Sequence, residues 1–423
     1  MVFGSSGNKK IKVFMNIFSK YYHRDLEKFF SQITPNGCLV KIINSQNDVI
    51  VGQYDYIILT NTLSYVVDIQ IYVQNLKKHC KENAKIIVIN FNFLWKPFLD
   101  LATKIGLREK TKNEPNWLWF SDLQNIFSLE GYQEVKTGRR FLFPIPFGYI
   151  SDFINKYLAH LPLLNNLCLT TYQIYRSFPR HINKSVSIII PARNEEGNVK
   201  NVLRKIPSFG GSQVEVIFIE GHSKDNTLEV IKGEIISNTT DIKARIYKQS
   251  GVGKGDAVRL GFQKAKNDIL MILDADLTVN PDDLPKFYNA LVGGHCDLAN
   301  GSRLVYPMEQ EAMRTLNYIG NKIFSVMFTF LLGQKIKDTL CGTKALFRKD
   351  YLKIAKNRKY FGNFDPFGDF DLLFGACRLN LKIVDIPVRY RERRYGTTNI
   401  TRFSHGLLLL KMTVFAAKKI KFI

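Results

Sequence analysis

Four mostly apolar runs separated by helical segments occupy residues 185–276, and they restrict the possible folds more than any other feature. The runs are "SVSIIIPA", "VEVIFIEG", "ARIYKQ" and "DILMILDAD". A strand with one wet face would alternate apolar and polar residues, whereas continuous apolar runs are typical of a parallel sheet covered by helices on both faces. We therefore predict an α/β domain with its ligands at the carboxyl ends of the strands.

Polar residues follow each run, where that rule places ligand groups. They are Pro191 to Glu195, Glu220 to Asp225, Ser250 to Asp256, and the pair Asp274 and Asp276. Alternate residues of an extended segment point to one face, and two carboxylates there repel unless a cation neutralises them. A divalent ion such as Mg²⁺ or Mn²⁺ accepts one or two carboxylates. An isolated pair of this kind is more often a solvated strand end; the polar groups on the other strands favour a metal site here.

The next two aspartates have a simpler explanation. Asp282 and Asp283 follow Asn280 and Pro281. Asparagine is a good helix N-cap, proline fits the first helical turn, and acidic residues there suit the helix dipole. We predict a helix start at this point.

The length and charge set broad limits on the rest of the chain. The 423 residues favour two domains, and the basic segment around residue 180 suggests domains at 1–180 and 181–423. A net charge of +23 favours anionic partners. The six cysteines form no metal-type or disulfide-type pattern, and neither a signal peptide nor a spanning helix is expected. These features suggest a cytoplasmic protein.

Several segments resemble one enzyme family when they are taken in order. They are "VSIIIPARNEEGNV", "IEGHSKDNT", "GVGKGDAVRLGF", "ILDADLTVNPDDL" and "IPVRYRERRYGTTNI". Together they look like a family 2 glycosyltransferase of the GT-A fold, close to the dolichol-phosphate and polyprenyl-phosphate sugar synthases. The resemblance covers about residues 185–400.

The resemblance implies roles for individual residues. Asp274 and Asp276 match the metal-binding pair, Thr278 stands where related enzymes can supply a third ligand, and Arg393 matches the arginine that stabilises the leaving diphosphate. Arg303 and Arg314 match basic positions near the donor and acceptor phosphates. The donor nucleotide is expected to meet Pro191, Ala192, Arg193, Glu195, Glu220, Asp225, Lys254 and Asp274. Asp225 can equally cap a helix.

Three positions differ from the family pattern. Gly221 and His222 replace an acid and a glycine of the second motif, and Asn399 replaces a lysine near Arg393. In the loop that contains Lys254, the following residue is Gly255, so a nucleotide-binding P-loop is not expected.

The implied reaction is inverting sugar transfer from a nucleoside-diphosphate sugar. A lipid phosphate acceptor is already ionised and needs no base, whereas a hydroxyl acceptor needs a carboxylate to take its proton. The segment "FDPFGDFDLLFGA" offers Asp371, which aligns with an acidic family position, and Asp369, which can instead cap a helix.

The last 37 residues, 387–423, combine nine Lys or Arg with apolar residues and one acid. Such a segment suits a membrane interface with anionic lipid. An amphipathic helix packed on the catalytic domain would have the same pattern, so both explanations stay open.

The first half resembles the later part of a class I S-adenosylmethionine-dependent methyltransferase. "YDYIIL" corresponds to its fourth strand, "AKIIVINFN" to its fifth, and "SDLQNIFSLEGYQEV" to the helix and strand that follow. A glycine-rich cofactor turn is missing, and only about ten residues separate a first strand from the fourth, fewer than a helical crossover needs. We predict a truncated domain that does not bind S-adenosylmethionine; a generic α/β unit is the alternative.

The sequence thus predicts a membrane-associated glycosyltransferase that uses Mg²⁺ or Mn²⁺, with a nucleoside-diphosphate sugar as donor and a polyprenyl phosphate or a glycan as acceptor. The alternative is a non-catalytic sugar-nucleotide-binding or scaffold protein with two decayed enzyme domains. Nucleic-acid binding rests on the positive charge alone and is not expected.

Overall fold

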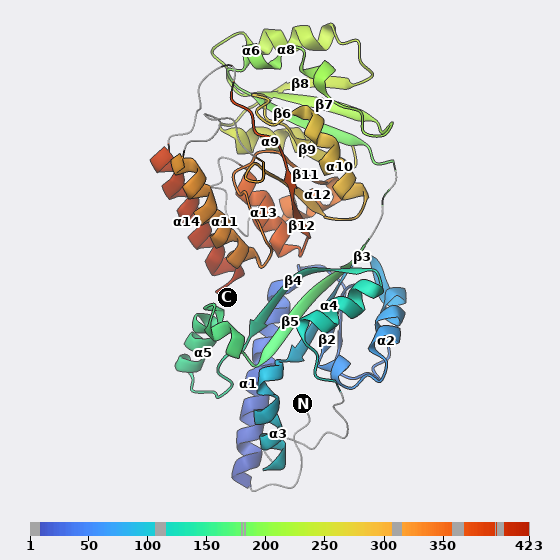
Figure 1. The fold of residues 1–423 in the computed structure, drawn as a ribbon, viewed down its shortest axis with the longest axis vertical. Coiled ribbons are helices and arrows are strands. Elements are labelled where there is room, and N and C mark those ends of the chain that lie inside the picture. Colours follow the sequence, from blue (N-terminus) through green and yellow to red (C-terminus); the bar gives the residue numbers. More distant parts are fainter. Residues whose placement is uncertain are drawn as a thin grey trace. The chain divides into compact units, whose positions relative to one another are not determined.

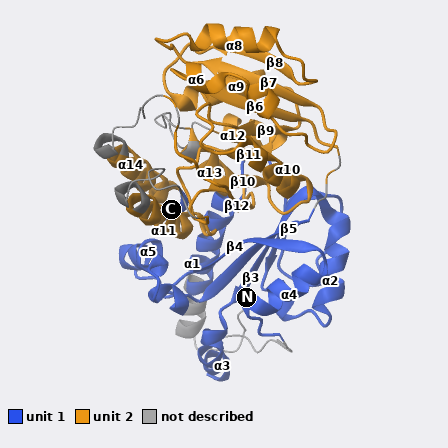
Figure 2. Cartoon of the chain, turned by 45° about the horizontal axis from the view of Figure 1, so that its top comes forward, with its two compact units in different colours: residues 1–179, 420–423 blue, residues 180–419 orange. Residues whose placement is uncertain are grey.

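The chain forms two compact units, one of residues 1–179 with 420–423 and the other of residues 180–419 (Figure 2). The computed structural model describes residues 9–105, 116–178, 181, 183–306, 315–357, 368–393, 395 and 402–422. Each unit is an α/β fold built on one mixed sheet.

Unit 1 contains a five-stranded sheet with the order β1-β2-β3-β5-β4. β1, β2 and β3 are parallel, and β5 runs antiparallel to both of its neighbours (Figure 1). The strands are β1 (Val40–Ile43), β2 (Tyr54–Thr60), β3 (Cys80–Phe91), β4 (Tyr132–Arg140) and β5 (Thr170–Ser177). Ten residues, 44–53, join β1 to β2 without a helix between them, so the connection is as short as the sequence indicated.

The two faces of this sheet bury separate apolar clusters. Ile58 and Ile87 pack with residues of helix α1 on one face, whereas Ile57 and Ile86 pack with Phe127 of α4 on the other. Alternate residues of a strand point to opposite faces, which explains the division. The α-helices of unit 1 are α1 (Lys9–Ile33), α2 (Ile69–Leu76), α3 (Lys96–Lys104), α4 (Phe120–Leu129) and α5 (Tyr149–Lys156).

Unit 2 contains a seven-stranded sheet with the order β12-β10-β11-β9-β6-β7-β8. The strands are β6 (Val186–Ala192), β7 (Val214–Glu220), β8 (Lys243–Lys248), β9 (Ile269–Ile272), β10 (Leu298–Ser302), β11 (Lys344–Phe347) and β12 (Ile383–Pro387). The longer helices are α8 (Thr227–Ile236), α9 (Lys254–Lys264), α10 (Leu284–Val292), α11 (Thr315–Leu332), α12 (Arg348–Lys356), α13 (Asp369–Arg378) and α14 (Arg402–Ile420), and α6 (Glu196–Val199) and α7 (Val202–Lys205) are short.

The four apolar runs form the parallel strands β6 to β9, as predicted, but the sheet of unit 2 as a whole is mixed. β6 to β9 are parallel, but β11 lies between β9 and β10 and is antiparallel to both. Because β11 runs the other way, its first residue lies at the edge where β9 and β10 end. The start of β11 therefore adds residues to this edge of the sheet, which the ends of the parallel strands alone would not provide.

The prediction of an extended Asp274-x-Asp276 segment is wrong. β9 ends at Ile272, and a turn follows in which the Leu277 amide donates to the Asp274 carbonyl at 3.1 Å. Leu277 has a φ of 51°, in the left-handed region. The prediction of an Asn280 cap is confirmed, because its side chain accepts from the Asp282 amide before α10.

Candidate active site

The loops after β6 and β7 are joined by hydrogen bonds at the carboxyl edge of the sheet. The Asn194 amide donates to Ser223 Oγ at 3.1 Å, and the Glu196 amide donates to Asp225 Oδ2 at 3.3 Å. Asp225 also accepts from the amide and hydroxyl of Thr227. Burial would raise the pKa of Asp225, but these hydrogen bonds lower it below its usual value. The Asp225 carboxylate therefore caps the start of α8, which is the alternative role that the sequence analysis gave this residue.

The other predicted nucleotide residues lie around the same loops. Glu220 ends β7 and accepts from the Ser223 amide at 2.6 Å. Pro191 and Ala192 end β6, and Arg193 follows them as an exposed residue. Their roles in binding a nucleotide stay predictions.

Arg393 joins two acidic groups that come from different strands. Its Nη2 lies 2.7 Å from Asp276 Oδ2, and its Nη1 lies 3.3 Å from Glu195 Oε1. Burial would lower the pKa of Arg393, but the two carboxylates raise it. Asn198 donates to the second oxygen of Glu195 at 2.6 Å. This charge network holds the segment after β12 against the turn after β9.

Asp276 has a second partner in Thr278, whose amide and hydroxyl donate to Oδ1 at 3.1 and 2.9 Å. Thr278 therefore contacts the carboxylate directly. Further along, the Arg391 amide donates to the Thr278 carbonyl at 2.8 Å, and Val279 pairs with Tyr390 in an isolated bridge. These backbone contacts position Arg393 beside Asp276.

Asp274 forms a separate ion pair. Lys254, the first residue of α9, places Nζ 2.5 Å from Asp274 Oδ1. Burial would raise the pKa of Asp274, but Lys254, and then Lys344 and Arg303, lower it. A Cβ added to Gly342 would collide with Lys254 Nζ and Asp274 Oδ2, so glycine lets the backbone approach this pair closely.

Arg303, at the end of β10, is held by an acid that the sequence did not point to. Its Nε lies 2.7 Å and its Nη2 2.9 Å from the two oxygens of Asp338, which is fully buried. Asn321 of α11 also donates to Asp338 at 2.7 Å. Burial would raise the pKa of Asp338, but Arg303 and these hydrogen bonds lower it to about 2. The Arg303 guanidinium is thereby fixed in orientation beside the site.

The segment before β11 supplies the functional groups that the sequence analysis missed. Lys344 is fully buried, donates to the Cys341 carbonyl, and contributes to lowering the pKa of Asp274. Lys344 pairs with Asn300 of β10, so Lys344 lies at the edge of the sheet where the predicted site residues lie. The signal was Lys344 close to Asp338 in "DTLCGTKALF", because a buried cation requires a nearby acid.

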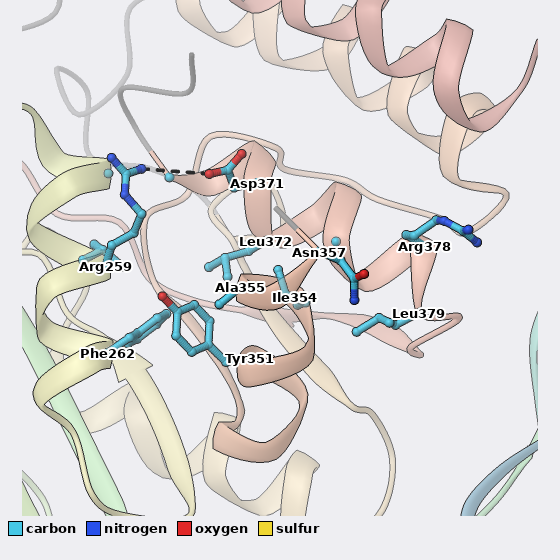
Figure 3. A pocket seen from close by; sticks show the side chains of 14 residues that line it. Arg259, Phe262, Tyr351, Ile354, Ala355, Asn357, Asp371, Leu372, Arg378 and Leu379 are labelled. Carbon is cyan, nitrogen blue, oxygen red and sulfur yellow. Dashed lines mark ion pairs between the residues drawn. The ribbon is translucent and has the colours of Figure 1, made fainter. Parts of the chain in front are cut away.

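Asp371, the candidate base, lies on α13 at the wall of a pocket between α9, α12 and α13 (Figure 3). Its Oδ2 is 3.9 Å from Arg259 Nη1, and apolar groups such as Phe262, Tyr351 and Leu372 form most of the remaining lining. The pocket begins at Gly255, next to Lys254. Asp369 begins α13, but its side chain is outside the described part, and Arg314 lies outside the described residues altogether.

The site thus brings together Glu195, Asp276 and Arg393, and separately Lys254 and Asp274. In the described ranges, no group of three or more His, Cys, Asp or Glu could hold a metal by itself. Two neighbouring carboxylates fit an ion whose other positions are filled by phosphate oxygens and water. Both carboxylates already face a cation, which indicates that this edge of the sheet suits positive charge.

The chain is similar to known proteins over part of its length. Residues 187–354 match the family model described as Glycosyl transferase family 2. A dolichyl-phosphate hexose transferase of Haloferax volcanii is 27% identical over 54% of this chain and 92% of its own length. A UDP-N-acetylglucosamine–dolichyl-phosphate N-acetylglucosaminyltransferase of Methanococcus voltae is 27% identical over 54% of this chain and 97% of its own length.

Among solved structures, the glucosyl-3-phosphoglycerate synthase of Mycobacterium tuberculosis, determined with Mn²⁺ and uridine diphosphate, is 17% identical. The match covers 56% of this chain and 80% of that one, with a TM-score of 0.41. The chain is thus similar to glycosyl transferase family 2 over residues 187–354.

Proposed function

We propose that the protein is an inverting, metal-dependent glycosyltransferase that moves a sugar from a nucleoside-diphosphate sugar to a polyprenyl phosphate or glycan at a membrane surface. The observation that carries the proposal is the turn after β9, where Asp274 and Asp276 each face a cation, Lys254 and Arg393. Relatives named for transfer to dolichyl phosphate support the lipid phosphate as acceptor.

Asp274 and Asp276 are the residues that would hold Mg²⁺ or Mn²⁺. Such an ion, when bound with the donor, stabilises the negative charge on the diphosphate. Lys254 and Arg393 contact these carboxylates, so each cation is within side-chain reach of a diphosphate bound at the turn.

Arg393 then stabilises the leaving diphosphate, because a guanidinium binds phosphate oxygens through two parallel hydrogen bonds. It must exchange at least one of its partners, Asp276 or Glu195, for the phosphate. Arg303 is different, because Asp338 holds its guanidinium in place. We infer that Arg303 contributes a fixed positive potential beside the donor.

The acceptor decides whether Asp371 takes part. A lipid phosphate attacks as an anion and needs no base, so Asp371 would remain paired with Arg259. A sugar hydroxyl needs a proton acceptor, and Asp371 is then the base. The named relatives favour the first case.

Peripheral membrane association is supported by α11 and α14, which lie side by side (Figures 1 and 2). α14 buries Leu409, Met412 and Ala416. Apolar side chains are exposed on both helices, namely Ile319, Ile323, Val326, Phe330, Leu407, Leu410 and Val414. No helix in the described part of the chain is long and apolar enough to span a bilayer. These exposed residues can enter the interface of one leaflet.

For unit 1 we propose a truncated methyltransferase-like domain that acts as a scaffold. β2, β3, α4 and β4 correspond to the segments that carry the resemblance, and the helix-free connection between β1 and β2 leaves out the part that would bind the cofactor.

The activity is tested by measuring nucleoside-diphosphate release from a panel of donor sugars with Mn²⁺, with and without polyprenyl phosphate. We expect release from one donor, increased at least about tenfold by polyprenyl phosphate and abolished by chelation of the metal. Release that glycans alone stimulate would identify the hydroxyl acceptor. No release with any donor or acceptor would favour the non-catalytic alternative.

Gly342→Ala is expected to weaken donor use. The added methyl group would collide with the Lys254–Asp274 pair and force it apart. Overpacking of this kind costs about 1–3 kcal/mol, so we expect kcat/KM to fall about 5- to 150-fold. Gly233→Ala on α8, where nothing lies within 4 Å, is the matched control and should leave kcat/KM unchanged. Equal activity of the two variants would contradict the close approach.

A further inference from the structure

Three polar side chains of helix α5 in unit 1, Ser151, Asp152 and Asn155, form hydrogen bonds with the rest of the unit. Ser151 is fully buried, and its hydroxyl donates to the Ile145 carbonyl at 2.7 Å. Asn155 donates to Tyr21 and to the Phe143 carbonyl, both at 2.9 Å. Asp152 accepts from Tyr21 and Arg24, each at 3.2 Å. The polar face therefore anchors the helix.

The opposite face of α5 is apolar and exposed. Tyr149 is 93% exposed, Ile150 65% and Phe153 56%. The segments on either side continue this surface with Phe147, Tyr157, Leu161, Leu163 and Leu167, all exposed. A surface helix in water normally has the reverse arrangement, with apolar residues inside. A large apolar patch of this kind marks a binding surface. We call residues 145–167 the α5 patch.

Two lysines, Lys156 and Lys421, give the α5 patch a positive charge. Residues 141–169 contain one acid, Asp152, and Arg24 neutralises it. Lys156 is exposed, and its Nζ lies 5.8 Å from the centre of the Tyr157 ring. The end of the chain adds Lys421, because Phe422 packs on the rings of Tyr157 and His160, each at 5.7 Å.

We propose that the α5 patch is a docking surface of unit 1 for an anionic lipid bilayer. Phenylalanine, tyrosine and isoleucine bordered by lysine match the two parts of a membrane interface, the acyl boundary and the anionic headgroups. A second copy of this chain would present the same positive charge, which repels across an interface. The proposal concerns unit 1 and does not depend on sugar transfer.

The docking surface is tested by sedimentation of the full chain with protein-free vesicles. Vesicles of phosphatidylcholine with 30% phosphatidylglycerol (about one lipid in three) are compared with phosphatidylcholine alone. The test variant is Tyr149→Ser with Ile150→Ser. The matched control is Val49→Ser with Val67→Ser, which removes two apolar side chains of unit 1 that are 74% and 96% exposed and lie outside the patch.

We expect the test variant to bind the anionic vesicles at least about tenfold more weakly. Burial of one large apolar side chain in the membrane interface is enough to change the binding constant by this factor. The control should change binding less than about twofold. Lys156→Glu should weaken binding to the anionic vesicles and not to the neutral ones. Thermal unfolding and molecular mass are measured for each variant.

Equal vesicle binding by the test variant and the wild type would overturn the proposal, as would equal binding to both vesicle types. A dimer without lipid that the test variant dissociates would assign the patch to a second copy instead. Nucleoside-diphosphate release without polyprenyl phosphate is measured in parallel, so that failure of the proposed transfer reaction and failure of lipid docking are separate results.

Discussion

Asp276→Asn should reduce kcat of sugar transfer at least about 1,000-fold, the scale on which loss of a charge-stabilising group acts. The amide keeps an oxygen that can accept from Thr278, so the turn after β9 should persist. It removes the negative charge that pairs with Arg393 and that would hold the metal. Initial rates with saturating donor and Mn²⁺ measure the effect.

The matched control for Asp276 is Asp282→Asn, six residues along the same segment. Asp282 is an exposed residue at the start of the helical region that begins with Pro281. Its neutralisation should change kcat less than about twofold. If Asp276→Asn kept activity within about threefold of wild type, the assignment of the metal site to this turn would be wrong.

Asp338→Ala should destabilise unit 2 by about 3–5 kcal/mol, because it leaves the Arg303 charge without its buried partner. Urea unfolding followed by circular dichroism measures the loss. Asp241→Ala, at an exposed carboxylate, is the control and should cost about 0.5 kcal/mol or less. A cost below about 1 kcal/mol for Asp338→Ala would contradict the role of this pair.

The low pKa of Asp338 also gives a pH dependence. The pKa is about 2 in the folded protein, and an unfolded aspartate has a pKa of about 3.9. The folded state therefore binds fewer protons between these values, and its stability falls as the pH is lowered from about 4 to about 2. Asp338→Asn should remove this part of the slope when unfolding is measured across that range.

The sequence located much of the candidate site because strands β6, β7 and β9 are local features. Each is an apolar run that can be read in isolation, and the residues after it lie at one edge once the strands are parallel. Asp274, Asp276 and Lys254 were found in this way. Arg393 was predicted from the family resemblance. Its contact with Glu195 could be found only from the structure, because the two residues are 198 positions apart in the sequence.

The groups around Asp338 and Lys344 could not be found in the same way. Their position depends on β11 entering between β9 and β10 in the opposite direction, and such pairing is set by contacts between distant segments. The turn at Asp276 was missed for a related reason. The apolar pattern of the run continues past Ile272, but the strand ends there and Leu277 adopts a positive φ.

The ion pairs at the turn after β9 also determine what the proposed donor would do to the local charge. Asp274, Asp276 and Glu195 carry three negative charges, and Lys254 and Arg393 carry two positive ones. A divalent ion together with a diphosphate sugar is close to neutral. Binding of the proposed donor with its ion would then exchange counter-ions within a nearly balanced site, and Lys254 and Arg393 would pass from the carboxylates to the phosphates.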